Sequence, residues 1–205
     1  MYTFWTADCH FGHENIIKYC NRPFANKEEM HKRIIANWNQ RVQDGDVVVH
    51  IGDWCCRGNE RGVPGGRVPA EFWEQQVRGK IIFIEGNHDR NNGLRFYMRS
   101  AVMDVGPYRA FVVHVPPIRL HDIPEDCDIV LCGHVHERWR FNWVDDIPLI
   151  NVGVDANGFM PQRKDDIVNM VLKLKAARAL HLAASASEAA DEAVTEAEAN
   201  EPNVN

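Results

Sequence analysis

Apolar residues along the chain form two kinds of pattern, short continuous runs and longer segments with helical spacing. Residues 47–51 are a continuous run, which is typical of a strand buried on both faces of a sheet. Residues 27–42 repeat apolar side chains at intervals of about 3.6 residues, which predicts a helix with one buried face. The predicted strands are residues 2–8, 47–51, 80–85, 110–114, 128–132, 139–144 and 149–152, and the predicted helices are residues 27–42, residues 70–77 and one starting at Asp165.

The order of these elements changes along the chain. The first strands alternate with helices, whereas the later strands follow one another more directly. This mixture predicts an α/β protein with a two-layered sheet core flanked by helices, rather than a doubly wound parallel sheet. Residues 57–69 are rich in Gly and Pro, so we interpret them as a loop.

The composition narrows the class of protein. A length of 205 residues suits one domain with a sizeable core, and 45% hydrophobic with 25% charged residues is ordinary for a globular protein. No apolar run approaches the roughly 20 residues of a membrane span, so we expect no membrane partner. Residues 1–5 lack the basic segment of a signal peptide and the six Cys form no CxxC pair, so we expect a cytoplasmic protein with free thiols.

Acidic residues are concentrated at the C-terminal end. Six acids and no bases lie after residue 187, and the rest of the chain is balanced at 23 acids and 23 bases. A neutral body lacks the broad basic surface that long nucleic acids require, so we expect a small substrate. Residues 183–205 hold too little apolar surface to fold alone. We therefore expect a catalytic domain over residues 1–182 and a tail over 183–205 that is disordered or a frayed helix. The oligomeric state stays open.

Polar clusters follow five of the predicted strands, and the loops at strand ends of an α/β sheet converge on ligands. The clusters are Asp8-Cys9-His10, Gly52-Asp53, Gly86-Asn87-His88-Asp89, His114 and Gly133-His134-Val135-His136. Each fragment alone is more often a turn or a half-exposed side chain than a ligand. Their conjunction in this order indicates one site, and strand alternation would point both members of each Asp-x-His or His-x-His pair in one direction.

The ligand types indicate the kind of cation. Carboxylate, imidazole and amide groups without a thiolate favour ions such as Mn²⁺, Fe²⁺ or Zn²⁺ over a structural Cys-rich zinc site. Seven candidate ligands exceed what one ion needs, which suggests two divalent ions that share a carboxylate. Mn²⁺ is the first expectation, with Fe²⁺, Zn²⁺ or Ni²⁺ as alternatives.

The ordered motifs DxH, GD, GNHD, H and GHxH resemble those of the calcineurin-like metallophosphoesterase superfamily, over about residues 1–175. Residues 8–16 and 151–155 look like a compact bacterial and bacteriophage subgroup. The resemblance implies a four-layer α/β/β/α sandwich with two packed mixed β-sheets flanked by helices. The metal positions that it implies are Asp8, His10, Asp53 and His136 for one ion and Asp53, Asn87, His114 and His134 for the other, with Asp53 bridging.

Two such cations acidify a shared water molecule and hold a phosphate for in-line attack. His88 lies beside the ligand Asn87 but is not assigned to a metal, so it is the candidate general acid for the leaving group. Asp89 is the second candidate catalytic residue, which would orient His88 or raise its pKa, and the alternative is a loop hydrogen bond.

Several other polar residues have two interpretations or a structural one. His13 and Asn15 are candidate substrate contacts, although Asn15 is equally suited to cap a helix. Arg22 either contacts phosphate or stabilises a turn. His50 lies inside an apolar strand and is interpreted as a core histidine with satisfied hydrogen bonds, and His31 is interpreted as a solvated helix residue.

The expected activity is that of a phosphodiesterase acting on a small phosphodiester or nucleotide, with 2′,3′- or 3′,5′-cyclic nucleotides as leading candidates. A neutral body and a chain too short for an added domain favour small diesters over nucleic acids. The alternatives are a phosphomonoesterase acting on proteins or nucleotides, and then a nuclease. The non-enzymatic alternative is a metal-binding interaction scaffold, but such scaffolds typically lack metal residues and this sequence holds all seven together with His88.

Deletion of residues 183–205 tests the expected domain boundary. Because the tail lacks apolar surface and holds no candidate site residue, the shortened protein should bind the same number of metal ions and turn over a diester at nearly the full-length rate. Metal analysis and kinetics of both proteins check this. A large loss of either property would show that the tail supports the body.

Overall fold

The computed structural model describes residues 1–56, 68–89, 93–94 and 98–199. Its helices are α1 (Ile16–Tyr19), α2 (Lys27–Arg41), α3 (Ala70–Glu74) and α4 (Lys164–Ala199), with 3₁₀ turns η1 (Leu120–Asp122) and η2 (Val154–Asn157). Its strands are β1 (Thr3–Thr6), β2 (Val47–Ile51), β3 (Lys80–Ile84), β4 (Ser100–Val105), β5 (Tyr108–Val113), β6 (Ile129–Cys132), β7 (Phe141–Val144), β8 (Ile147–Asn151) and β9 (Gln162–Arg163). Among the described helices, none combines the length and apolar character that crossing a membrane requires.

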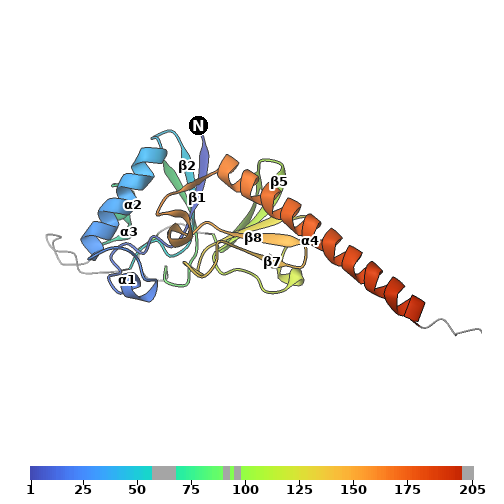
Figure 1. Cartoon of the computed structure of the whole chain (residues 1–205). Helices are drawn as coiled ribbons and strands as arrows, with labels where there is room; N and C mark the ends of the chain where they lie inside the picture. Colours follow the sequence, from blue (N-terminus) through green and yellow to red (C-terminus); the bar gives the residue numbers. More distant parts are fainter. Residues whose placement is uncertain (57–67, 90–92, 95–97, 200–205) are drawn as a thin grey trace, which may run out of the picture. The chain divides into compact units, whose positions relative to one another are not determined.

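The chain divides into two compact units, Met1–Val168 and Asn169–Asn205. Both sheets lie in the first unit (Figure 1). The first sheet has the order β3-β2-β1-β9, with β3, β2 and β1 parallel and β9 antiparallel. The second has the order β4-β5-β6-β8-β7, with a parallel centre of β5, β6 and β8 and an antiparallel strand at each edge. The expected α/β fold of two mixed sheets with flanking helices is therefore confirmed.

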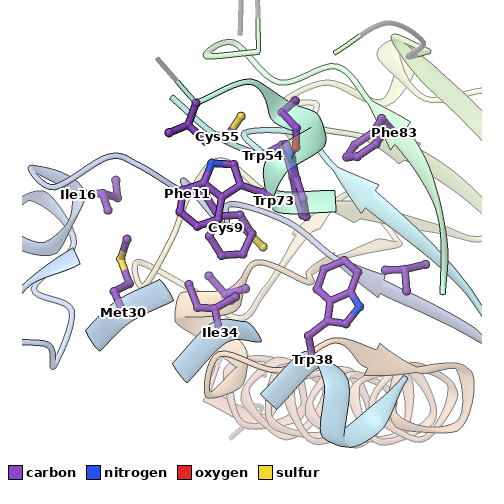
Figure 2. Close-up of a cluster of buried hydrophobic side chains, with 14 of the residues drawn as sticks. Cys9, Phe11, Ile16, Met30, Ile34, Trp38, Trp54, Cys55, Trp73 and Phe83 are labelled. Atoms are coloured by element: carbon purple, nitrogen blue, oxygen red, sulfur yellow. Dashed lines mark hydrogen bonds between the residues drawn. The ribbon is translucent and has the colours of Figure 1, made fainter. Parts of the chain in front are cut away.

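Side-chain alternation along β1 separates the two faces of the first sheet. Phe4 lies in the apolar cluster that α1, α2 and α3 build against this sheet, together with Trp38 and Trp73 (Figure 2). The next residue along the strand, Trp5, is buried on the opposite face, where its indole Nε1 donates a hydrogen bond to Met103 Sδ of β4 at 3.5 Å. The second sheet therefore covers the face of the first sheet that the helices leave free.

Helix α2 shows why the sequence pattern predicted its position. Asn26 caps the helix by accepting a hydrogen bond from the backbone N–H of Glu29 at 2.9 Å, and Glu29 in turn accepts one from the N–H of Ala25. The helix ends at Arg41 because Val42 is extended. The interpretation of His31 was wrong, since its side chain is only 6% exposed. It lies on the same buried face as Ile34 and Trp38, three and seven residues further on.

The other differences from the predicted elements have local causes. β1 ends at Thr6, before the expected residue 8, because Asp8 has a φ of 61° and cannot continue a strand. β4 was not predicted because it is an edge strand whose side chains are mostly exposed or half-buried, so the apolar signal is weak. Most of the predicted 57–69 loop lies outside the described residues. In the second unit, residues 183–199 are helical, as part of α4.

Candidate metal centre

The candidate ligands lie in the loops that follow β1, β2, β3, β5 and β6. Parallel strands end at the same edge of a sheet, so these loops meet. The candidate ligands form two groups, and within each group the ligand atoms lie within 4.8 Å of one another. One group is Asp8, His10 and His136, and the other is Asp53, His114 and His134. They match the two ligand sets that the resemblance implies, with two differences. Asn87 is missing from the second group, and Asp53 belongs to the second group alone instead of to both.

A single carboxylate oxygen joins the two groups. Asp53 Oδ2 lies 3.4 Å from His10 Nε2 and 3.3 Å from His114 Nε2. Asn87 completes the second group, because its Oδ1 lies 3.1 Å from His114 Nε2 and 2.9 Å from His134 Nδ1. The arrangement therefore provides two adjacent positions with Asp53 between them.

The first group has the chemistry of a cation site. Asp8 is fully buried, and both of its carboxylate oxygens accept a hydrogen bond from the backbone N–H of His134, at 3.1 and 3.0 Å. Burial raises the pKa of Asp8 to about 6, because no cation in the described part of the chain compensates its charge fully. Burial also lowers the pKa of His10 to about 4, and its buried Nε2 makes no hydrogen bond within the described residues. A neutral imidazole with a free lone pair beside a buried carboxylate fits a divalent cation.

The second group is dominated by the charge of Asp53. Burial alone would raise the pKa of Asp53, but its contacts with His10 and His114 outweigh burial and lower it. Burial lowers the pKa of His114, yet the carboxylates of Asp53 and Asp8 outweigh burial and raise it to about 9. The buried carboxylates of Asp8 and Asp53 therefore stabilise positive charge beside them, here as a proton on His114. A divalent cation would compensate the two negative charges more fully than one proton does.

Five of the candidate ligands have a left-handed backbone. Their φ angles lie between 50° and 70°, in Asp8, His10, Asp53, His134 and His136. Such φ values are uncommon outside Gly and cost about 1–3 kcal/mol each, so they persist only where the surroundings enforce them. The expectation that strand alternation aligns the ligand pairs was therefore wrong. Left-handed turns after the strands aim these side chains.

Two glycines allow loops to approach the Asp8 carboxylate. A Cβ atom built on Gly133 would lie 2.6 Å from Asp8 Oδ2, and one built on Gly153 would lie equally close to the same oxygen. Real Cβ atoms do not come this near to another heavy atom. The loops after β6 and β8 therefore depend on Gly to approach the Asp8 carboxylate.

The candidate general acid lies at the open side of the centre. His88 is exposed, and its ring packs edge-on against that of His10 with 5.4 Å between centroids. Its backbone N–H donates to Asp53 Oδ1 at 2.9 Å, which fixes the residue beside the bridging carboxylate.

Asp89 connects two ligand loops. Its buried carboxylate accepts hydrogen bonds from the backbone N–H groups of Gly86 (2.8 Å), Asp53 (2.8 Å) and Trp54 (2.9 Å). Of the two interpretations of Asp89, the structure supports the loop hydrogen bonds. We therefore treat Asp89 as a positioning residue and not as a catalytic one.

The three candidate substrate contacts lie in different environments. His13 is half-buried at the mouth of the centre, with its Nδ1 3.4 Å from His10 Nδ1. Asn15 is exposed directly before α1 and makes no side-chain cap hydrogen bond. Arg22 requires a correction, because its side chain is buried and its guanidinium binds Asp155 and the backbone carbonyl of Asp8. A guanidinium engaged in this way stabilises the loop and does not reach a substrate.

Sequence reasoning missed two residues that support the ligands. Asp155 Oδ2 lies 2.8 Å from His136 Nδ1, and the only signal for it was its place in the 151–155 stretch. His31 Nε2 accepts a hydrogen bond from the backbone N–H of Gly12 at 2.9 Å, which holds the loop between His10 and His13. Burial lowers the pKa of His31 to about 4, so its ring is a neutral acceptor at pH 7.

His50 also differs from its interpretation as a satisfied core residue. Neither ring nitrogen has a hydrogen-bond partner within the described residues, although the ring is fully buried. It packs edge-on against Trp54, with 4.9 Å between the ring centroids. Burial lowers its pKa to about 3, so the ring is neutral.

Comparison with known proteins identifies relatives of the whole body. Residues 6–175 match the calcineurin-like phosphoesterase superfamily domain. The uncharacterised protein MJ1445 of Methanocaldococcus jannaschii is 35% identical over 182 residues, which cover 85% of this chain and 94% of that protein. The Gene 66 protein of Mycobacterium phage L5 is 24% identical over 206 residues, with coverage of 82% and 95%. The crystal structure of AQ665, a protein of unknown function from Aquifex aeolicus, shares the fold at a TM-score of 0.63 with 22% identity, and 82% of this chain covers 98% of that one.

Replacement of Gly153 by Ala tests the close approach to Asp8. The φ of Gly153 is −57°, which Ala adopts freely, so the effect should come from the new methyl group, which would lie 2.6 Å from Asp8 Oδ2 and 2.8 Å from Asn151 Oδ1. We expect a loss of about 1–3 kcal/mol in the free energy of unfolding and weaker binding of one metal ion. Thermal unfolding and metal titration measure both.

Gly45→Ala is the matched control, because a Cβ atom there meets nothing within 4 Å. It should leave metal binding unchanged. Unaltered metal affinity in Gly153→Ala would contradict the steric role of this glycine.

Proposed function

Because the chain belongs to the calcineurin-like phosphoesterase superfamily, we propose that it is a phosphodiesterase with two divalent metal ions that hydrolyses small nucleotide-like diesters. The observation that carries the proposal is the position of Asp53 Oδ2 between His10 Nε2 and His114 Nε2, at 3.4 and 3.3 Å. A carboxylate oxygen shared by two imidazole groups is the arrangement that a pair of bridged cations needs.

The seven ligands divide between two positions. Asp8, His10 and His136 would hold the first cation, His114, His134 and Asn87 the second, and Asp53 both. Such a pair of cations supplies an acidified water nucleophile and neutralises charge on the phosphate during in-line displacement. The protein contributes the rigid placement of the ligands, which the left-handed turns and the Asp89 hydrogen bonds maintain.

The ligand set favours Mn²⁺, with Fe²⁺, Zn²⁺ or Ni²⁺ as alternatives. All seven side chains offer oxygen or nitrogen atoms, which suits borderline and harder divalent ions. Cys56 lies near His10 and His13, but burial raises the pKa of its thiol to about 11.

His88 is proposed as the general acid. It is exposed beside His10 and anchored by its backbone to Asp53, so its imidazole is accessible to a substrate bound at the ligand groups. A proton from this ring would neutralise the alkoxide that leaves when the P–O bond breaks. His13, whose ring centroid lies 6.1 Å from that of His88, and the exposed Asn15 are proposed to contact the substrate.

The substrate class follows from charge and size. Without the acidic tail, the chain holds equal numbers of acids and bases, which supports a compact substrate over a long polyanion. A cyclic nucleotide presents one diester and a leaving oxygen on ribose. That oxygen is strongly basic and therefore needs an acid such as His88.

Removal and return of metal tests the reaction class. Excess chelator should abolish turnover of bis(p-nitrophenyl) phosphate, and Mn²⁺ should restore it, because all catalytic charge stabilisation depends on the seven ligands. The same assay with p-nitrophenyl phosphate, which has the same leaving group, separates a diesterase from a monoesterase. Full activity in chelator with no bound metal would refute the dinuclear centre, and preference for the monoester would refute the diesterase assignment.

Replacement of His88 by Ala tests the general acid. The variant should keep both metal ions, because no ligand is lost, yet hydrolyse a cyclic nucleotide about 10²–10⁴-fold more slowly. The defect should shrink with bis(p-nitrophenyl) phosphate, whose leaving group departs readily as an anion. The deciding quantity is the rate loss of the variant on the cyclic nucleotide divided by its rate loss on bis(p-nitrophenyl) phosphate. Steady-state kinetics on both substrates measure it, and metal analysis shows that both ions are retained.

Two further variants are controls for this measurement. Asn87→Ala should weaken the second metal and slow both substrates alike. His121→Ala should change neither rate, because the His121 ring lies beside Asp122 and belongs to neither ligand group. Equal losses on both leaving groups in His88→Ala, with both metals bound, would make His88 a charge-stabilising residue instead of an acid.

A further inference from the structure

A buried ion pair lies beneath the first metal position. The Arg22 and Asp155 side chains are 0% and 2% exposed, and they meet in two parallel hydrogen bonds, from Nε to Oδ1 at 2.7 Å and from Nη2 to Oδ2 at 2.8 Å. The guanidinium also donates from Nη2 to the backbone oxygen of Asp8 at 2.7 Å and from Nη1 to that of Cys9 at 3.2 Å. Arg22 thus fixes the Asp155 carboxylate and the left-handed turn at Asp8 together.

Asp155 also decides which nitrogen of His136 is available to a cation. Its Oδ2 lies 2.8 Å from His136 Nδ1. The Arg22 guanidinium donates two parallel hydrogen bonds to this carboxylate, so Asp155 stands in the contact with His136 as an ion-paired acceptor. An ionised carboxylate only accepts hydrogen bonds, so the proton of the imidazole must be on Nδ1. The lone pair of Nε2 is then free for a metal ion.

The second position is held by different means. His114 Nδ1 lies 2.8 Å from the backbone oxygen of Ile51, which fixes this ring from the main chain of β2. Neither Arg22 nor Asp155 has a recorded hydrogen bond to Asp53, Asn87, His114 or His134 among the described residues. A change in the ion pair should therefore affect one position and spare the other.

We propose that Arg22 and Asp155 are positioning residues that set the affinity of the first metal position, a role that rests on the proposed dinuclear centre. Asp155 orients His136 and selects its Nδ1–H tautomer. Arg22 holds Asp155 in place and fixes the backbone that carries Asp8. Residues that orient a metal ligand in this way typically contribute about 10–100-fold to metal affinity.

Asp155→Asn is the sharpest test of this role. In one orientation, the new amide would direct N–H groups at His136 Nδ1–H and Arg22 Nη2, and in the other at Arg22 Nε. In the first orientation, an amide N–H would face the N–H at His136 Nδ1. This repulsion is relieved if the His136 proton moves to Nε2, which removes the lone pair that would bind a metal ion. We expect the affinity for one Mn²⁺ to fall about 10–100-fold and that for the other to stay within about twofold.

The experiment is a calorimetric titration of the metal-free, full-length protein and its variants with Mn²⁺. Proton–nitrogen correlation spectra of the metal-free proteins report which ring nitrogens of His136 carry protons, which a merely structural role would not change. Asp166→Asn is the matched control, because it removes a peripheral ion pair with Arg41, at 3.1 Å and partly exposed. It should bind both ions like the wild type.

A second variant covers the case in which Asp155→Asn does not fold, since it leaves Arg22 buried without a counter-charge. Arg22→Met combined with Asp155→Leu removes both charges and still deprives His136 of its acceptor, so it should also lose affinity at one position only. Two unchanged affinities in a folded variant, or equal losses at both positions, would overturn the positioning role. A wild-type protein that binds no Mn²⁺ would instead overturn the dinuclear centre itself, and this proposal with it.

Discussion

The Asp53 carboxylate is the interaction on which the rest of the centre depends. One of its oxygens lies between imidazole nitrogens of the two ligand groups, and the other accepts the backbone N–H of His88. Its own backbone N–H donates to Asp89, and its carbonyl oxygen accepts the N–H of His10 at 3.0 Å. The loops after β1, β2 and β3 are thus tied to each other through a single residue at the end of a central strand.

Holding such a residue in place is costly, because the charges are buried and the backbone is strained. Five candidate ligands have left-handed backbones, and four buried carboxylates lie close together, those of Asp8, Asp53, Asp89 and Asp155. The large apolar cluster between the first sheet and α1, α2 and α3 supplies rigidity on one side of these loops (Figure 2). Hydrogen bonds tie the loops to each other as well, as the three backbone N–H groups that donate to Asp89 illustrate. Strain concentrated at ligands and offset by packing elsewhere is the expected distribution for a functional site.

The two proposed metal positions are built by different physical means. At the second position, a backbone carbonyl of β2 orients His114, so the sheet itself sets the geometry. At the first position, the orienting group of His136 is a side chain whose own position depends on Arg22, which follows α1. Side-chain networks adjust more readily than a strand does, so the two positions can differ in affinity within one fold. This asymmetry is compatible with a centre in which both ions share the charge of Asp53.

The sequence by itself determined the strands with continuous apolar runs, the position of α2 and the set of candidate ligands, because periodicity and motif spacing are local properties. It did not determine β4, an edge strand whose apolar residues form neither a long run nor an alternation, or the burial of His31 on a predicted helix. Tertiary structure alone decided that Arg22 is buried under the centre and that Asp155 faces His136, because these partners lie 133 and 19 residues apart in the chain. It also decided that left-handed turns, and not strand alternation, aim the ligand pairs. The local sequence shows which chemical groups are available at the site. The orientation of each side chain depends on contacts between segments that are distant in the chain.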